Sequence, residues 1–362
     1  MHAFTFQANP ARVIFGAGNL QQLGAEVERL GARRALVLCT PEQAASAQQV
    51  LALLGDRGAG LFARAAMHVP LETAREARAE AERLGADCAV AIGGGSTTGL
   101  GKAIALDSGL PIIAIPTTYA GSEMTPIYGI TEGGIKRTGR DLRVMPRTVI
   151  YDPELTLTLP YAMTVTSAIN AIAHAAEGLY AHDGNPVVAL MAEEGIRACA
   201  AALAPLQADP HDLAARSDAL YGAWLCGTVL GSVAMGLHHK LCLTLGGSFN
   251  LPHAQTHTVV LPHALAYNAA AAPQAMRRIT RALHAADPSL DASNPARALQ
   301  TLAARHGAPV SLAALGMPAE GLDRAADMAA DLASNTPYPN PRPLQRDALR
   351  ALLQRAFEGA AP

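Results

Sequence analysis

The sequence is nearly neutral, poor in lysine and without a long uninterrupted apolar segment. It carries 28 Lys and Arg against 30 Asp and Glu, a net charge of −2, so it lacks the basic surface that nucleic acids and anionic membranes attract. Its longest apolar runs are interrupted by Gly, Pro, Ser or Thr before they reach the length that spans a bilayer. We therefore expect neither nucleic acid nor a membrane as a partner.

The cysteines also exclude a class of protein. There are five, an odd number, and no two form a CxxC pair. A disulfide framework is therefore not expected, and the N-terminus does not resemble a secretion signal. These features predict a reducing, cytoplasmic setting. The cysteines are Cys39, Cys88, Cys199, Cys226 and Cys242.

Only three of the 28 basic residues are lysines: Lys102, Lys136 and Lys240. Lysine offers a compact ammonium whose pKa responds to burial, whereas arginine offers a planar fork that stays charged. A chain that places arginine on its surface can keep lysine where that ammonium is needed. The alternative is a codon bias with three chance survivors.

The order of elements indicates two domains. Up to about residue 153, short β-rich runs alternate with helical stretches, which is typical of a parallel sheet covered by helices. Beyond Pro160 the pattern is helical, interrupted at 183–186, 209–210 and 287–288. We predict an α/β dinucleotide-binding domain over 1–155 and an all-helical substrate domain over 156–362. The β-rich runs are 34–39, 60–63, 88–92, 111–115 and 148–151.

Two glycine- and hydroxyl-rich segments follow predicted strands. The first, Gly93-Gly94-Gly95-Ser96-Thr97-Thr98, precedes a helix expected over 99–106, and the second runs from Pro116 to Ser122. Glycines let the backbone approach a diphosphate, and a helix N-terminus attracts its charge. One such loop alone could be a tight turn, but two at the carboxyl edge of a sheet favour a nucleotide site. The GxGxxG fingerprint of ordinary Rossmann dehydrogenases is absent.

A polar constellation marks the helical half. Asn170 and His174, four residues apart, share a helix face, and His238, His239, Lys240 and His253 follow downstream. Such a set resembles a cage of three histidines and one carboxylate in which an amide has replaced the carboxylate. Because an amide lacks the anionic oxygen that divalent ions favour beside imidazole, we expect a site that works by hydrogen bonding. His257 and His263 are left outside it: His257, four residues after His253, can support that residue, and His263, after Pro262, can cap a helix end.

These motifs resemble a known family along almost the whole chain: the group III, iron-type alcohol dehydrogenases, with a dehydroquinate synthase-like fold. The resemblance rests on segments 93–96, 116–118, 121–125, 170–174 and 250–253, which occur in the family's order. Within it, segments 93–102, 131–140 and 236–242 look most like the maleylacetate reductase branch. That branch reduces an unsaturated oxo-diacid with a nicotinamide cofactor during the breakdown of aromatic compounds.

The resemblance implies roles for particular residues. It implies that NADH or NADPH binds to Gly93, Gly94, Gly95, Ser96, Thr117 and Thr118, with Lys136 near the ribose and Thr158 a weaker candidate. It also implies a metal-free site for a dicarboxylate substrate. We expect His239, His253 and Lys240 to hold its oxyanion and carboxylates, and Asn170 and His174 to orient the pocket.

Two alternatives stay open. The chain could be a metal-dependent alcohol dehydrogenase with iron or zinc between Asn170, His174, His239 and His253. It could also be a non-redox descendant, because Leu243 stands where relatives place a further histidine; in a working reductase His238 or His253 would compensate. The strand expected over 10–15 could pair at a sheet edge, which would allow a homodimer.

Overall fold

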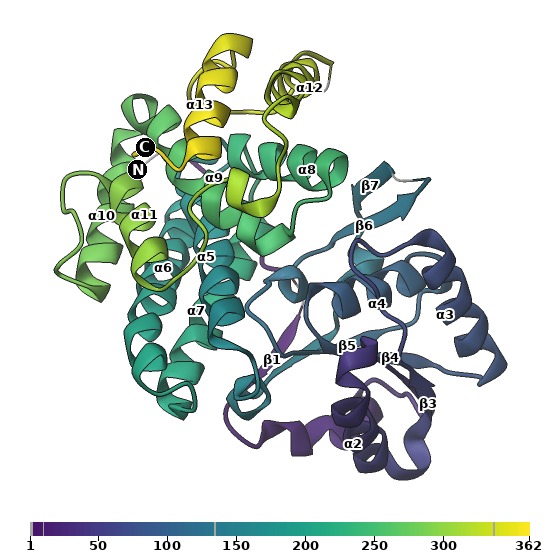
Figure 1. The fold of residues 1–362 in the computed structure, drawn as a ribbon. Coiled ribbons are helices and arrows are strands. Elements are labelled where there is room, and N and C mark those ends of the chain that lie inside the picture. Colours follow the sequence, from purple (N-terminus) through teal and green to yellow (C-terminus); the bar gives the residue numbers. More distant parts are fainter. Residues whose placement is uncertain (1–2, 10, 134, 336) are drawn as a thin grey trace. The chain divides into compact units, whose positions relative to one another are not determined.

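A computed structural model of the chain describes residues 3–9, 11–133, 135–335 and 337–362. Two compact units are present: residues 8–159 form one, and residues 160–362 with the N-terminal residues up to Gln7 form the other. Figure 1 shows the first in purple to teal and residues 160–362 of the second in teal to yellow. Of the strand expected over 10–15, Arg12–Phe15 is observed, and Pro10 lies outside the described residues.

The first unit is built on the predicted parallel sheet. Its six strands are hydrogen-bonded in the order β1-β8-β5-β4-β2-β3, every neighbouring pair parallel. Gly93 of β4 pairs with Pro116 of β5, so the two polar segments start side by side at one sheet edge. The strands are β1 (Arg12–Phe15), β2 (Ala35–Leu38), β3 (Gly58–Phe62), β4 (Cys88–Gly93), β5 (Ile112–Pro116) and β8 (Thr148–Tyr151).

Helices cover both faces of this sheet, which explains why its strands read as continuous apolar runs. In β2, Val37 packs in one core with helices α1 and α2, whereas Leu36 and Leu38 pack in another with α3 and α4. Alternate side chains of a strand point to opposite faces, so both faces must be apolar. The helices are α1 (Leu23–Arg29), α2 (Ala44–Leu54), α3 (Leu71–Arg83) and α4 (Gly95–Ser108).

An antiparallel hairpin, β6 (Ile127–Glu132) paired with β7 (Ile135–Arg140), was not predicted. Its sequence carries the signal, a Gly133-Gly134 dipeptide between two β-rich runs, which is typical of a hairpin. Lys136 lies on β7, but its side chain is outside those that the structure describes.

The second unit is helical, as predicted, with no strand among its described residues. Its breaks fall where Asp, Asn and Pro were expected to interrupt helices; for example, the Asn185 side chain accepts hydrogen bonds from the first amides of α6. The helices are α5 (Tyr161–Gly178), α6 (Pro186–Ala208), α7 (Leu213–Ser232), α8 (Leu237–Phe249), α9 (His253–Asn268), α10 (Pro273–Ala286), α11 (Pro295–Arg305), α12 (Gly321–Asn335) and α13 (Arg346–Glu358).

In the described part of the chain, no helix by itself combines the length and the hydropathy needed to cross a membrane. Helices α7 and α8, bent by 96° to each other, meet these criteria only as a pair.

Helix α5 is the buried centre of this unit. Every residue from Thr164 to Gly178 on it is buried, and it packs against α6, α7 and α9. A helix enclosed on all sides is normally apolar throughout. The polar residues that α5 carries are therefore held in fixed positions, and their hydrogen bonds must come from the protein.

Candidate active site

Helix α5 presents three buried polar side chains along one face. Asn170 and His174 lie one turn apart, as their spacing predicted, and Glu177 follows a further turn on. Their exposed fractions are 3%, 3% and 0%. Residues at i, i+4 and i+7 share a helix face, so all three side chains point toward the same region.

Glu177 was not predicted as a functional residue, yet it organises the site. Its carboxylate accepts the backbone N–H groups of Gly236 at 3.0 Å, His238 at 2.9 Å and His239 at 3.3 Å. Gly236 is the N-cap of α8, where free amides and the helix dipole favour an anion. Glu177 therefore fixes the start of the helix that carries His238, His239 and Lys240.

The charge on Glu177 fixes the direction of the hydrogen bond to His239. Burial alone would raise the pKa of Glu177, but a hydrogen bond from His239, the nearby imidazoles and the backbone amide of His238 lower it to about 2. The carboxylate is therefore ionised and can only accept. Nδ1 of His239, 2.6 Å from Oε2 of Glu177, donates to it.

The chain of polar groups continues through the second imidazole. With Nδ1 of His239 protonated, its Nε2 is an acceptor in the neutral ring, and Nδ1 of His174 donates to it at 2.7 Å. Nε2 of His174 then faces the Nδ2 amide of Asn170 at 3.5 Å. Asn170, His174, His239 and Glu177 thus form one directed series of contacts ending on a buried negative charge.

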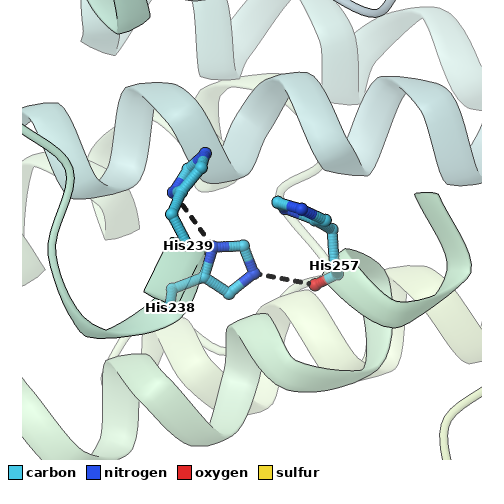
Figure 2. A group of neighbouring side chains, drawn as sticks. All are labelled: His238, His239 and His257. Atoms are coloured by element: carbon cyan, nitrogen blue, oxygen red, sulfur yellow. Dashed lines mark hydrogen bonds between the residues drawn. The ribbon is translucent and has the colours of Figure 1, made fainter. Parts of the chain in front are cut away.

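His238 and His257 lie beside this series (Figure 2). Nε2 of His238 donates to the backbone carbonyl of His257 at 3.0 Å. Burial, followed by the charge of His239, lowers the pKa of His238 to about 4, so the ring is neutral at pH 7. Its other nitrogen, Nδ1, lies 3.4 Å from Nδ1 of His239.

The sequence predicts His257 outside the site, but in the structure its ring lies among the other imidazoles. Ring centroids are 4.3 Å away for His253, 4.8 Å for His238 and 5.1 Å for His239. Both of its ring nitrogens are buried and have no hydrogen-bond partner among the described residues. Burial keeps the pKa of His257 well below its usual value, so it contributes a neutral ring.

The other predicted residues divide between two places. His253, exposed at the first position of α9, and Lys240, half-buried in the first turn of α8, join the cluster region. His263 does not, and lines a pocket of about 290 Å³ with Tyr267, Arg342 and other residues.

The arrangement of the rings bears on the metal that the family's name implies. Ring nitrogens of His238, His239 and His257 lie within 4.8 Å of one another (Figure 2). However, Nε2 of His238 carries a proton that it donates to the carbonyl of His257. A second proton lies between Nδ1 of His174 and Nε2 of His239, so these nitrogens have no lone pair open to an ion. A bound ion needs bare lone pairs and usually an anionic ligand. The residues, as arranged, do not fit iron or zinc held by His174 and His239.

The first unit carries the predicted glycine-rich segment, with one correction. Helix α4 begins at Gly95 and not near Gly99, so Ser96, Thr97 and Thr98 form its first turn. Gly93 has φ of 149°, and a Cβ there would lie 2.5 Å from the Gln43 and Thr97 side chains. Oγ1 of Thr97 is buried without a partner among the described residues. The glycine backbone before α4 and the N-terminus of α4, which has no side-chain cap, are suited to binding a diphosphate.

The second segment lies against the first. The Thr117 amide donates to the Gly93 carbonyl at 3.1 Å, and its hydroxyl accepts from Gln43 at 2.8 Å. A Cβ on Gly94 would come within 3.1 Å of the Thr118 side chain. The structure thus brings Gly93, Gly94, Thr117 and Thr118 together. Thr158 is exposed in a separate turn before Pro160.

Lys102 is structural support for these segments. Its buried ammonium donates to the carbonyl oxygens of Ser122 at 2.6 Å, Thr125 at 2.8 Å and Ile127 at 2.7 Å. Burial lowers its pKa to about 7. It therefore anchors the chain between the second polar segment and the hairpin.

Comparisons with known proteins agree with this architecture. Residues 10–153 match the iron-containing alcohol dehydrogenase family, and residues 164–357 match its C-terminal domain. A maleylacetate reductase from Burkholderia cepacia is 69% identical over 100% of both chains, and one from Sphingobium indicum is 56% identical over 99% of both. The crystal structure of a maleylacetate reductase from Agrobacterium tumefaciens, 52% identical over 100% of both chains, superposes with a TM-score of 0.93.

The chain therefore belongs to the iron-containing alcohol dehydrogenase family and is an oxidoreductase. This family works with nicotinamide dinucleotides, which agrees with the cradle around Gly93. Within the family, its sequence groups with the maleylacetate reductases, as segments 93–102, 131–140 and 236–242 predicted.

Proposed function

We propose that this protein reduces maleylacetate, or a close unsaturated oxo-diacid, to the saturated 3-oxo-diacid with NADH or NADPH, in the breakdown of aromatic compounds. The observation that carries the proposal is full-length identity of 69% to a maleylacetate reductase. In the reaction, a hydride and a proton add across a carbon–carbon double bond conjugated with a ketone. A reduced nicotinamide supplies the hydride when bound.

The side chains of the histidine cluster suit the charge that this reaction develops. Hydride addition at the distal alkene carbon places negative charge on the ketone oxygen, which hydrogen-bond donors can stabilise without a Lewis acid. We assign the binding of that oxygen and of the substrate carboxylates to His253 and Lys240, with His238 beside them. His239 is assigned to the proton transfer, because its ring nitrogens face Glu177 and His174. Losing one well-placed donor typically costs about 3 kcal/mol of transition-state stabilisation, or about a hundredfold in rate.

The pair of His174 and His239 suits the proton transfer. An additional proton on this pair, which already holds one N–H on each ring, would be balanced by ionised Glu177, 2.6 Å from His239. Shifting the proton along the 2.7 Å contact would move it toward His174 and Asn170. Asn170 Oδ1 is buried without a partner among the described residues, so it can accept from a bound group there. We propose that this pair protonates the enolate carbon.

We further propose that no metal takes part, because Asn170 supplies no negative charge and a hydrogen bond joins the facing nitrogens of His174 and His239.

We propose that residues 1–155 bind the dinucleotide and that residues 156–362 bind the dicarboxylate. The dinucleotide would contact the six predicted Gly, Ser and Thr residues together with Lys136 and Thr158. A homodimer is consistent with β1 at the edge of its sheet. A cytoplasmic location is consistent with five buried free cysteines.

The test is the reaction itself. Purified protein, maleylacetate and either NADH or NADPH are followed at the nicotinamide absorbance. We expect oxidation of the cofactor that depends on maleylacetate, with formation of 3-oxoadipate. No oxidation with either cofactor, using protein shown by calorimetry to bind the cofactor, would reject the proposal.

A further inference from the structure

The proline-rich loop 337–343 is fixed against α9. Nδ2 of Asn340 donates to Oδ1 of Asn268 at 2.8 Å, and Nδ2 of Asn268 donates back to Oδ1 of Asn340 at 3.0 Å. The Tyr267 hydroxyl donates to the carbonyl of Pro343 at 2.6 Å. Prolines at 337, 339, 341 and 343 restrict the backbone between these contacts. Tyr338, within this loop, is therefore held in one place.

The hydroxyl of Tyr338 is a buried donor. Its oxygen is shielded from solvent and has no hydrogen-bond partner among the described residues. Burial, and then the charge of Glu177, keep the pKa of Tyr338 far above neutrality, so the group stays protonated. Buried hydroxyls in proteins normally have partners, and an unmatched one marks a position for a water or a ligand.

Lys240 lies over the ring of Tyr338, with Nζ 5.6 Å from the ring centroid. It follows His239 in the first turn of α8 and is half-buried. No carboxylate in the described part of the chain forms an ion pair with it, in contrast to Lys102, whose ammonium is surrounded by carbonyl oxygens. Lys240 thus offers a cation with an aromatic wall and no counter-ion among the described residues.

We propose that Tyr338 and Lys240 together bind a carboxylate of the substrate, and that Tyr338 selects dicarboxylates over monocarboxylates. A tyrosine hydroxyl and an ammonium supply complementary donors for the two oxygens of a carboxylate. Glu177 does not repel such an anion strongly, because His239 and three backbone amides already compensate its charge. The inference rests on the proposed function, since it concerns the same oxo-diacid.

The substrate suits this division of tasks. An unsaturated oxo-diacid carries its reacting ketone and alkene between two carboxylates. The pair of His174 and His239 can serve the reacting carbon while Lys240, the neighbour of His239, holds a carboxylate at one end, since adjacent helix residues point in different directions. Tyr338 then contributes to binding of substrate and transition state alike, so its loss should raise KM more than it lowers kcat.

The experiment measures binding separately from turnover. Calorimetry gives the Kd of adipate and of hexanoate, two six-carbon acids that differ in the second carboxylate, for the cofactor-loaded wild type and three variants. We expect Tyr338→Phe to weaken adipate about tenfold and hexanoate less than about twofold, and Lys240→Met to weaken adipate about a hundredfold. Tyr221→Phe, on α7 beside Trp224, is the matched control and should change neither value.

Equal losses for both acids, or unchanged adipate binding in Tyr338→Phe, would overturn the subsite. Melting temperatures show whether each variant is folded. Maleylacetate turnover of the same samples separates the two proposals. If adipate binds selectively and this selectivity is lost in Tyr338→Phe, but maleylacetate is not turned over, the reaction is rejected and the subsite is kept. Full turnover with unchanged KM in Tyr338→Phe would reject the subsite and keep the reaction.

Discussion

Nδ1 of His174 and Nε2 of His239 face each other at 2.7 Å, and the opposite side of the His239 ring donates to the buried carboxylate of Glu177. Two imidazoles joined in this way can exchange a proton between their outer ends without moving. The carboxylate determines which nitrogen of His239 is protonated and stabilises the ring when it is charged.

The first prediction concerns that carboxylate. Glu177→Gln should lower kcat by about a hundredfold or more, because the amide no longer balances a charged His239 and can enforce the wrong tautomer. KM for maleylacetate should change much less. Glu194→Gln, which breaks the ion pair with Arg197 on α6, is the control for a lost carboxylate. Equal kcat values for Glu177→Gln and wild type would contradict the assigned role.

The second prediction concerns pH and stability. Burial, followed by the charge of Arg355, lowers the pKa of His263 from 6.5 to about 4 in the folded protein. Between these values the unfolded chain takes up a proton that the folded protein does not, so stability falls as the pH drops from 6.5 toward 4. His263→Phe should remove about 2 to 3 kcal/mol of this loss. Urea unfolding at pH 7 and pH 4 gives the free energy of unfolding of both proteins. If wild type and His263→Phe lose the same free energy of unfolding between these pH values, the prediction is wrong.

The third prediction concerns Leu243, four residues after His239 on α8. If the site already contains its proton donors, Leu243→His should change kcat/KM for maleylacetate less than about tenfold. A missing general acid, once restored, would be worth about a hundredfold or more. Steady-state kinetics of the two proteins decides between these outcomes. Activity that appears only in the variant would favour a non-redox descendant.

The fourth prediction concerns the cofactor cradle. Gly93→Ala places a Cβ 2.5 Å from the side chains of Gln43 and Thr97, so the strand end must shift. We expect the Kd for NADH to rise about tenfold or more, with a loss of about 1 to 3 kcal/mol in stability. Gly109→Ala has a positive φ of 71° but no atom within 4 Å, and so controls for backbone strain. Unchanged NADH binding in Gly93→Ala would contradict the cradle.

Much of the fold follows from local signals in the sequence. Strand β2 and its neighbours are apolar throughout because helices cover both faces, and the helix breaks at Asp183, Asp209 and Asp287 coincide with polar caps and proline. The start of α4 was misplaced because Gly95, Ser96 and Thr97 have low helix propensity. They are nevertheless helical, since the first turn packs against the second polar segment.

The site was predictable in its imidazoles but not in its connections. Spacing placed Asn170 and His174 on one face, and the density of histidines after residue 237 marked the cluster. Glu177 and Tyr338 could not be predicted because each reaches the site through a tertiary contact. Glu177 contacts the start of α8. Tyr338 contacts Lys240 from a loop about a hundred residues away in the sequence. One available signal was the carboxylate of Glu177, three residues after His174, in a helix that carries no other Asp, Glu, Lys or Arg.

Metal binding should respond to a single change at residue 170. Asn170→Asp restores the carboxylate that metal-using relatives are expected to carry at this position, and it supplies the anionic ligand that the imidazoles lack. We expect this variant to take up zinc or iron in proportion to the protein and to lose maleylacetate reduction. It is therefore the matched positive control for metal analysis of the wild type.

The most direct test of the account measures metal content and turnover on the same wild-type sample. Elemental analysis gives iron and zinc per chain, and NADH oxidation with maleylacetate is followed before and after exhaustive chelation. We predict far less than one metal ion per chain and the same rate in both assays. One iron or zinc per chain, with activity lost on chelation and regained when that ion is returned, would contradict the account.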